Sequence, residues 1–264
     1  MFKVKDYISL KLPPICIAHR GYSSIYPENT LLSLTKAVEA GAEVVELDVR
    51  ATADQQLVVF HDPTLQRATG IEASINKLTL AQLKRIDLGK GQHIPTLSEA
   101  LEALTGKIGL NIHLYVKGRQ IDKVVELCTQ HKALESAFLA LSYPEEIARL
   151  RKDYPDVYIC TGYRAAQHDY LEHALKLDAH ILQALRGAPY LSKTWVEKAH
   201  ENGFPVEVFY ADTYMDMKWM QRLGVDSVLT NNPPTFHAVY GAPQNQRKPS
   251  PQTSRANKPP KWRL

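Results

Sequence analysis

Two apolar runs joined by a short polar turn decide the fold: residues 44–61 read VVELDVRATADQQLVVFH. The runs 44–48 and 57–61 have the length and the β-branched content of strands. Only eight residues separate them, whereas a helical crossover between parallel strands needs about a dozen or more. We therefore expect an antiparallel hairpin that turns at 53–56, with its second strand forming an arm beside the sheet.

Strands and helices alternate along the rest of the chain. The other strand candidates are 15–18, 108–116, 137–141, 157–160, 180–183, 206–210 and 227–229. The helix candidates are 30–40, 97–104, 120–131, 144–154, 165–177, 192–202 and 213–223. Strand–helix–strand repetition predicts a parallel sheet, and eight strands remain once the hairpin arm is set aside. The predicted fold is therefore α/β, a (β/α)8 TIM barrel.

The hairpin and the segment after it have further consequences. With residues 54 and 55 at the tip of the turn, Asp48 pairs with His61, and such partners share one face of the sheet. Segment 62–95 is too long for a plain loop, which predicts a small inserted subdomain over one end of the barrel. The chain thus divides into a barrel domain over 1–240, with the insert at about 62–95, and a tail over 241–264.

Composition limits the class of protein. The chain has 264 residues, of which 44% are hydrophobic and 23% charged, which excludes collagen-like, fully disordered and polytopic membrane proteins. The net charge of +4 comes from the tail, which holds six basic residues, several prolines and no acid. We therefore expect no nucleic-acid-binding face on the barrel. The tail is predicted to be disordered, either solvated or in weak contact with an anionic membrane surface.

The apolar runs of the sequence also predict where in the cell the protein lies. None of them reaches the length of a membrane span, and the N-terminus lacks the uninterrupted apolar region of a signal peptide. We therefore expect a cytoplasmic protein without a transmembrane segment.

Polar residues with catalytic potential lie in or directly after the first three strand candidates. His19 and Arg20 come directly after the first strand, at the barrel end where active sites lie. Glu46 and Asp48 alternate with apolar residues, so both carboxylates point to one face, and two acids inside a barrel are costly unless neutralised. A divalent cation with oxygen ligands would neutralise them, and salt bridges to Arg50 are the alternative.

These residues form a set of motifs. They read HRG at 19–21, PENT at 27–30, ELDV at 46–49, VFHD at 59–62 and TLQRATG at 64–70. The set resembles the signature of the glycerophosphodiester phosphodiesterase family. The resemblance implies a TIM barrel that uses a divalent metal to hydrolyse glycerophosphodiesters to an alcohol and glycerol 3-phosphate.

The resemblance also implies roles for single residues. His19 and His61 would be the acid and base histidines, Arg20 a phosphate ligand, and Glu46 and Asp48 metal ligands. Asn29, in the second motif, is expected to cap the next helix and hold its loop.

The strand at 111–117 departs from the family pattern. It reads NIHLYVK where the family has a sequence similar to NIEIK, so His113 stands in the place of a metal-binding Glu and Tyr115 in that of a Lys. Lys117 shares their face by the period of two and could reach a phosphate. The resemblance implies Mg²⁺ or Ca²⁺, whereas a nitrogen ligand would suit Mn²⁺, Co²⁺ or Zn²⁺. The alternative is that His113 does not bind the metal.

The substrate stays open. Residues 209–210 read FY where the family commonly has a Trp-Thr pair, and members with changed pockets take other diesters. The expected ligand is therefore a small glycerophosphodiester or a lysophospholipid. The alternatives are a lysophospholipase D-like enzyme at membrane surfaces, a degenerate barrel that binds a phosphorylated ligand without turnover, and a glycosidase-like hydrolase that uses the carboxylates.

Overall fold

The chain forms a closed barrel of eight parallel strands, which confirms the predicted (β/α)8 fold. The computed structural model describes residues 2–162 and 170–241. The barrel strands are β1 (Ile15–Ala18), β2 (Val44–Ala51), β4 (Gly109–Leu114), β5 (Ala137–Leu141), β6 (Tyr158–Thr161), β7 (Ile181–Leu185), β8 (Val206–Phe209) and β9 (Ser227–Thr230). Strand β1 pairs with both β9 and β2, and this pairing closes the barrel.

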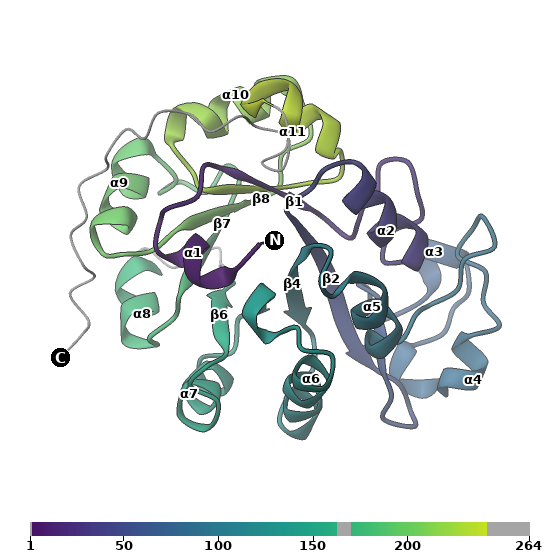
Figure 1. Cartoon of the computed structure of the whole chain (residues 1–264). Helices are drawn as coiled ribbons and strands as arrows, with labels where there is room; N and C mark the ends of the chain where they lie inside the picture. Colours follow the sequence, from purple (N-terminus) through teal and green to yellow (C-terminus); the bar gives the residue numbers. More distant parts are fainter. Residues whose placement is uncertain (1, 163–169, 242–264) are drawn as a thin grey trace.

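Helices surround the strands (Figure 1). They are α2 (Leu31–Glu39), α5 (Leu97–Leu104), α6 (Arg119–Gln130), α7 (Pro144–Asp153), α8 (Tyr170–Lys176), α9 (Lys193–Glu201), α10 (Tyr214–Leu223) and α11 (Pro233–Tyr240). For each predicted helix that the structure describes in full, the observed ends differ from the predicted ends by at most one residue. The start of the predicted helix 165–177 lies outside the described residues. Helix α11 was not expected, although prolines are tolerated in a first helical turn.

The short helix α1 (Val4–Ile8) closes the N-terminal end of the barrel. Val4 and Tyr7 are buried against apolar side chains of β1, β2 and other strands. The Tyr7 hydroxyl lies 2.7 Å from the Oγ atom of Ser227 on β9. One turn of helix is too short to produce a recognisable period in the sequence, so this plug was not predicted. It leaves the opposite, C-terminal end of the barrel for a site.

Strand β3 (Leu57–Val59) forms the predicted hairpin with β2, but the predicted register is wrong by one residue. Val49 pairs with Val59, and the amide N–H of Phe60 donates to the carbonyl oxygen of Asp48 at 2.9 Å. Phe60, and not His61, therefore lies opposite Asp48. The cause is the turn: the N–H of Thr52 donates to the carbonyl oxygen of Gln56, which makes a loop of three residues instead of two.

The segment 62–95, which was predicted to form an inserted subdomain, connects β3 to α5. It contains α3 (Gln66–Thr69), a 3-10 helix (Ile75–Lys77) and α4 (Leu80–Leu83). A small apolar cluster holds it together, made of Val58, Phe60, Leu65, Ile75, Leu83 and Ile94. Figure 1 shows the insert at the side of the barrel, beside α2 and α5.

Two predictions remain, one about the tail and one about membrane spans. The predicted disordered tail, apart from Gly241, lies outside the described residues. Among the helices that the structure describes, none has the length and apolar character needed to span a bilayer.

Candidate active site

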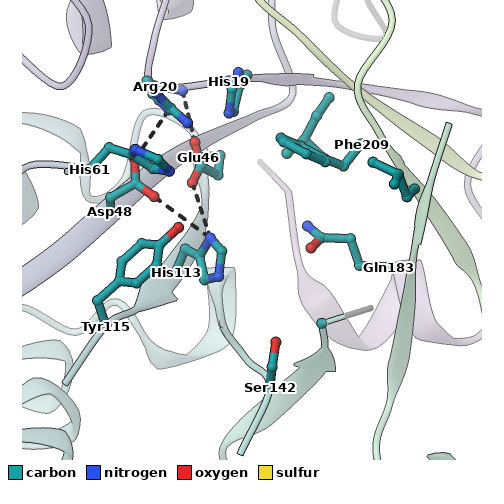
Figure 2. A pocket seen from close by; sticks show the side chains of 13 residues that line it. His19, Arg20, Glu46, Asp48, His61, His113, Tyr115, Ser142, Gln183 and Phe209 are labelled. Carbon is teal, nitrogen blue, oxygen red and sulfur yellow. Dashed lines mark hydrogen bonds and ion pairs between the residues drawn. The ribbon is translucent and has the colours of Figure 1, made fainter. Parts of the chain in front are cut away.

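A cavity of about 290 Å³ opens at the C-terminal end of the barrel strands. Six of the seven predicted site residues line it: His19, Arg20, Glu46, Asp48, His61 and His113. Tyr115, Ser142, Gly162, Gln183, Leu185, Phe209 and Leu229 complete the wall. Figure 2 shows the charged side chains on one side of the cavity and Gln183 and Phe209 on the other. The predicted residues that converge here come from four different segments of the chain.

The two acids of β2 point into the cavity, as the alternation of the strand predicted. Glu46 and Asp48 are both buried, with 2% and 1% of their surface exposed. Burial, together with the nearby Asp48, raises the pKa of Glu46 well above its usual value. The Oδ1 atom of Asp48 has no hydrogen-bond partner among the described residues. A buried, unpartnered carboxylate oxygen is unfavourable without a positive group beside it.

His113 adds a third ligand atom to this pair. The parallel register of β2 and β4 places it beside Asp48. Its Nδ1 atom lies 3.6 Å from Oδ1 of Asp48 and 3.9 Å from Oε1 of Glu46, too far for a hydrogen bond. Burial lowers the pKa of His113, so that the neutral ring is favoured. The three ligand atoms lie within 4.8 Å of one another, an arrangement that fits one divalent cation.

Arg50, the alternative partner for the acids, does not take that role. Its Nε atom donates to the carbonyl oxygen of His61 at 2.6 Å, and its guanidinium lies 4.3 Å from the ring centre of Tyr115. Salt bridges from Arg50 therefore do not neutralise Glu46 and Asp48.

Arg20 reaches the acids from the turn after β1. Its backbone φ of 56° and that of Gly21 at 84° reverse the chain. A Cβ atom on Gly21 would lie 2.4 Å from the backbone of Ser33, so only glycine fits there. The N–H of Arg20 donates to Glu46, and its Nε atom lies 3.4 Å from Asp48 (Figure 2). The turn thus holds the guanidinium at the edge of the cavity.

His19 is held in one tautomer by its neighbours. The side-chain amide of Asn231 donates to Asp212 at 2.6 Å, which fixes the amide orientation. Its Oδ1 atom therefore faces Nδ1 of His19, 2.8 Å away, and Nδ1 must carry the proton. Burial, assisted by Arg20, lowers the pKa of His19 to about 4. The ring is thus neutral near pH 7, with a free electron pair on Nε2.

His61 has a different partner. Its Nδ1 atom lies 2.6 Å from Oδ1 of Asp62. Burial opposes ionisation of Asp62, but hydrogen bonds from Arg67 and His61 outweigh it and lower the pKa of Asp62. An ionised carboxylate can only accept, so Nδ1 of His61 donates to it. Strand β3 ends before His61. The histidine therefore reaches the cavity although it does not pair with Asp48 as predicted.

Lys117 is the predicted site residue that the structure does not bring into the cavity. Strand β4 ends at Leu114, so the alternation of faces stops before position 117. The ammonium of Lys117 lies over the ring of Tyr143 and 4.0 Å from Glu145, and its side chain is 56% exposed. The expectation that Lys117 contacts a phosphate is therefore corrected.

Some residues at the site were not predicted or were given another role. Asn29 does not cap α2, since Thr30 does. The Asn29 amide instead donates to Oδ2 of Asp48 at 2.7 Å. Gln183 and Ser142 also line the cavity, and no motif in the sequence marked them.

Comparisons with known proteins agree with this geometry. The family model for the glycerophosphoryl diester phosphodiesterase family matches residues 19–235. A glycerophosphodiester phosphodiesterase of Caldanaerobacter subterraneus is 29% identical over 84% of this chain and 96% of its own. The mouse lysophospholipase D GDPD1 is 31% identical over 54% of this chain and 50% of its own.

A solved structure gives the same result. A phosphodiesterase of Oleispira antarctica, in complex with the product sn-glycerol-3-phosphate, is 28% identical. It has a TM-score of 0.79 and covers 88% of this chain and 98% of its own. Because the family model spans most of the sequence and its match includes every residue that converges on the cavity, the chain belongs to the glycerophosphoryl diester phosphodiesterase family.

Proposed function

We propose that this phosphoric diester hydrolase cleaves glycerophosphodiesters to an alcohol and glycerol 3-phosphate, with His19 and His61 as its proton-transfer pair. One observation carries the proposal: both imidazoles line a cavity that also holds three clustered ligand atoms, and the Nδ1 atom of each ring is hydrogen-bonded to a neighbouring side chain. The named activity of the Caldanaerobacter relative and the product bound in the Oleispira structure support the substrate class.

The two histidines differ in their partners, which suggests different roles. His19, neutral and with a free electron pair on Nε2, takes a proton from the attacking water as the oxygen of that water bonds to phosphorus. His61 gives its proton to the oxygen of the leaving alcohol as the phosphorus–oxygen bond breaks. The carboxylate of Asp62, which accepts from Nδ1 of His61 at 2.6 Å, holds the ring in place for the transfer.

Glu46, Asp48 and His113 would hold one divalent cation. A bound cation stabilises negative charge on the phosphate oxygens. The family resemblance favours Mg²⁺ or Ca²⁺, and the nitrogen ligand favours Mn²⁺, Co²⁺ or Zn²⁺. Arg20 supplies the second positive charge at the phosphate. Tyr115, whose hydroxyl points toward Asp48 and His113 in Figure 2, stays a neutral donor because burial raises its pKa.

Activity on two diesters tests these roles. His19→Ala and His61→Ala are each expected to lower turnover of glycerophosphocholine by about 10²–10⁴-fold. A p-nitrophenolate needs no proton to leave, so His61→Ala should keep more activity on bis(p-nitrophenyl) phosphate than His19→Ala does. A His19→Ala protein that is folded by circular dichroism and fully active would refute the assignment, and a wild-type chain that binds phosphate ligands without turnover would indicate the degenerate barrel.

A lysophospholipid is the second candidate substrate. Leu185, Phe209 and Leu229 give the cavity an apolar wall, and the mouse relative is named a lysophospholipase D. Activity on lysophosphatidylcholine and glycerophosphocholine, measured after chelation and separate return of each metal, would decide both the substrate and the ion. Sedimentation with anionic liposomes, with and without residues 241–264, would test whether the basic tail of a cytoplasmic protein contacts a membrane.

A further inference from the structure

Arg67 in the insert joins two carboxylates that come from separate segments. Its Nε atom donates to Oδ2 of Asp62 at 2.5 Å. Its two terminal nitrogens donate to the two oxygens of Glu28, at 3.0 and 2.6 Å. Glu28 lies in the loop after β1, and Asp62 follows β3. A single guanidinium thus bridges the loop after the first barrel strand and the end of the hairpin arm.

Each of these carboxylates also holds a side chain of the cavity. Oε1 of Glu28 accepts from a terminal nitrogen of Arg20 at 2.9 Å. Oδ1 of Asp62 accepts from Nδ1 of His61 at 2.6 Å. Arg67 itself does not line the cavity. Arg67 is therefore linked through one carboxylate, Glu28, to the proposed phosphate ligand Arg20. Through the other carboxylate, Asp62, it is linked to the proposed catalytic residue His61.

Stability does not account for this arrangement. The side chain of Arg67 is 51% exposed, and exposed ion pairs add little to the free energy of unfolding. The three hydrogen bonds have a geometric effect instead, because the planar fork of an arginine fixes two carboxylates relative to each other. Hydrogen bonds from Arg67 also help to lower the pKa values of Glu28 and Asp62, against the effect of burial.

We propose that Arg67 is a positioning residue, which sets the placement of Arg20 relative to His61 through Glu28 and Asp62. The inference rests on the proposed function, in which these two side chains act on one phosphodiester. It also gives the insert a task in the reaction, since the insert supplies the bridge. A lysine could replace it only in part, because one ammonium on a flexible stem lacks the fork that reaches both carboxylates.

Kinetics of three variants test the proposal. Arg67→Gln removes the bridge, Arg67→Lys keeps the charge, and Arg85→Gln removes the same charge from an exposed position of the insert. With glycerophosphocholine and saturating metal, Arg67→Gln is expected to lower kcat/KM by about 10–100-fold. Arg67→Lys should recover part of the loss, and Arg85→Gln should match the wild type. In an Asp62→Asn background the effect of Arg67→Gln should be smaller.

A second readout does not depend on activity. The Nδ1–H proton of His61, assigned by its absence in His61→Gln, is expected to give an NMR signal that shifts or disappears in Arg67→Gln and stays in Arg85→Gln. An inactive wild type would refute the proposed function, and this signal would still decide the position of His61. Unchanged kcat/KM in Arg67→Gln, or a fall without any change in the His61 signal, would overturn the proposal.

Discussion

The imidazole of His19 donates from Nδ1 to the side-chain oxygen of Asn231, 2.8 Å away. The amide of Asn231 is itself held by Asp212 at 2.6 Å. This contact leaves Nε2 of His19 without a proton, and the proposed role of the ring as a base depends on it.

Replacement of Asn231 by alanine should therefore lower kcat more than it raises KM. His19 would lose its acceptor and sample the other tautomer, and a loss of about 10–100-fold is expected. Steady-state kinetics on glycerophosphocholine measure the effect. Asn76→Ala, at an exposed position of the insert, is the matched control. Equal kcat values in the two variants would show that Asn231 does not orient His19.

His113→Glu should change the preference for metals. A third carboxylate adds one negative charge and a hard oxygen ligand to the cluster of Glu46 and Asp48. Affinity for Mg²⁺ and Ca²⁺ is expected to rise by about tenfold or more relative to Zn²⁺. Calorimetric titration of the metal-free protein measures this, with His93→Glu at an exposed position as the control. Unchanged relative affinities would show that His113 lies outside the coordination sphere.

His180 should make the protein less stable in acid. Burial, assisted by Arg151, lowers its pKa from 6.5 to about 4, and its Nδ1 atom accepts from the N–H of Ile159 at 3.1 Å. Below pH 6.5 His180 binds a proton in the unfolded chain but stays neutral in the folded chain. The free energy of unfolding therefore falls as the pH drops from 6.5 to 4. The ring is partly exposed, and the loss is therefore at most about 2 kcal/mol.

His180→Asn keeps an acceptor at that position but cannot take up the proton. The free energy of unfolding from urea titrations should therefore fall less between pH 7 and pH 4.5 in this variant than in the wild type. Parallel curves for the two proteins would contradict the assignment.

The sequence predicted the fold well because its signals were local. Strand bounds follow apolar runs, helix ends follow caps, and the hairpin follows from a connection too short for a crossover. The failures come from geometry that no local pattern contains. The one-residue error in the β2–β3 register depended on whether Thr52 closes a loop of two or three residues. Lys117 was misplaced because the strand period was continued past Leu114, where β4 ends.

The site shows the same limit. Six of its residues could be identified because their motifs match a family, and alternation placed both acids on one face. Asn29, Asn231 and Asp212 reach the site through amide contacts between segments far apart in the chain. No period or spacing encodes such contacts. Residues that hold other residues therefore become visible only when the barrel closes.

Glu207 on β8 is another residue that only the closed barrel explains. It is fully buried, and its Oε1 atom accepts from Gln183 at 2.7 Å and from Asn111 at 3.0 Å. Its Oε2 atom has no partner among the described residues. Burial raises its pKa from 4.5 to about 7, although these two hydrogen bonds oppose the shift.

The folded chain therefore holds a proton on Glu207 between pH 4.5 and 7 that the unfolded chain releases, and stability falls as the pH rises through this window. Glu207→Gln keeps the acceptor oxygen and removes the titration. The variant should be more stable than the wild type at pH 8. The difference between their free energies of unfolding should be about 1–3 kcal/mol larger at pH 8 than at pH 5. Urea unfolding of the metal-free proteins measures this, with the exposed Glu201→Gln as control. A difference that does not grow with pH would mean that Glu207 ionises at its ordinary value, so that water must reach the centre of the barrel.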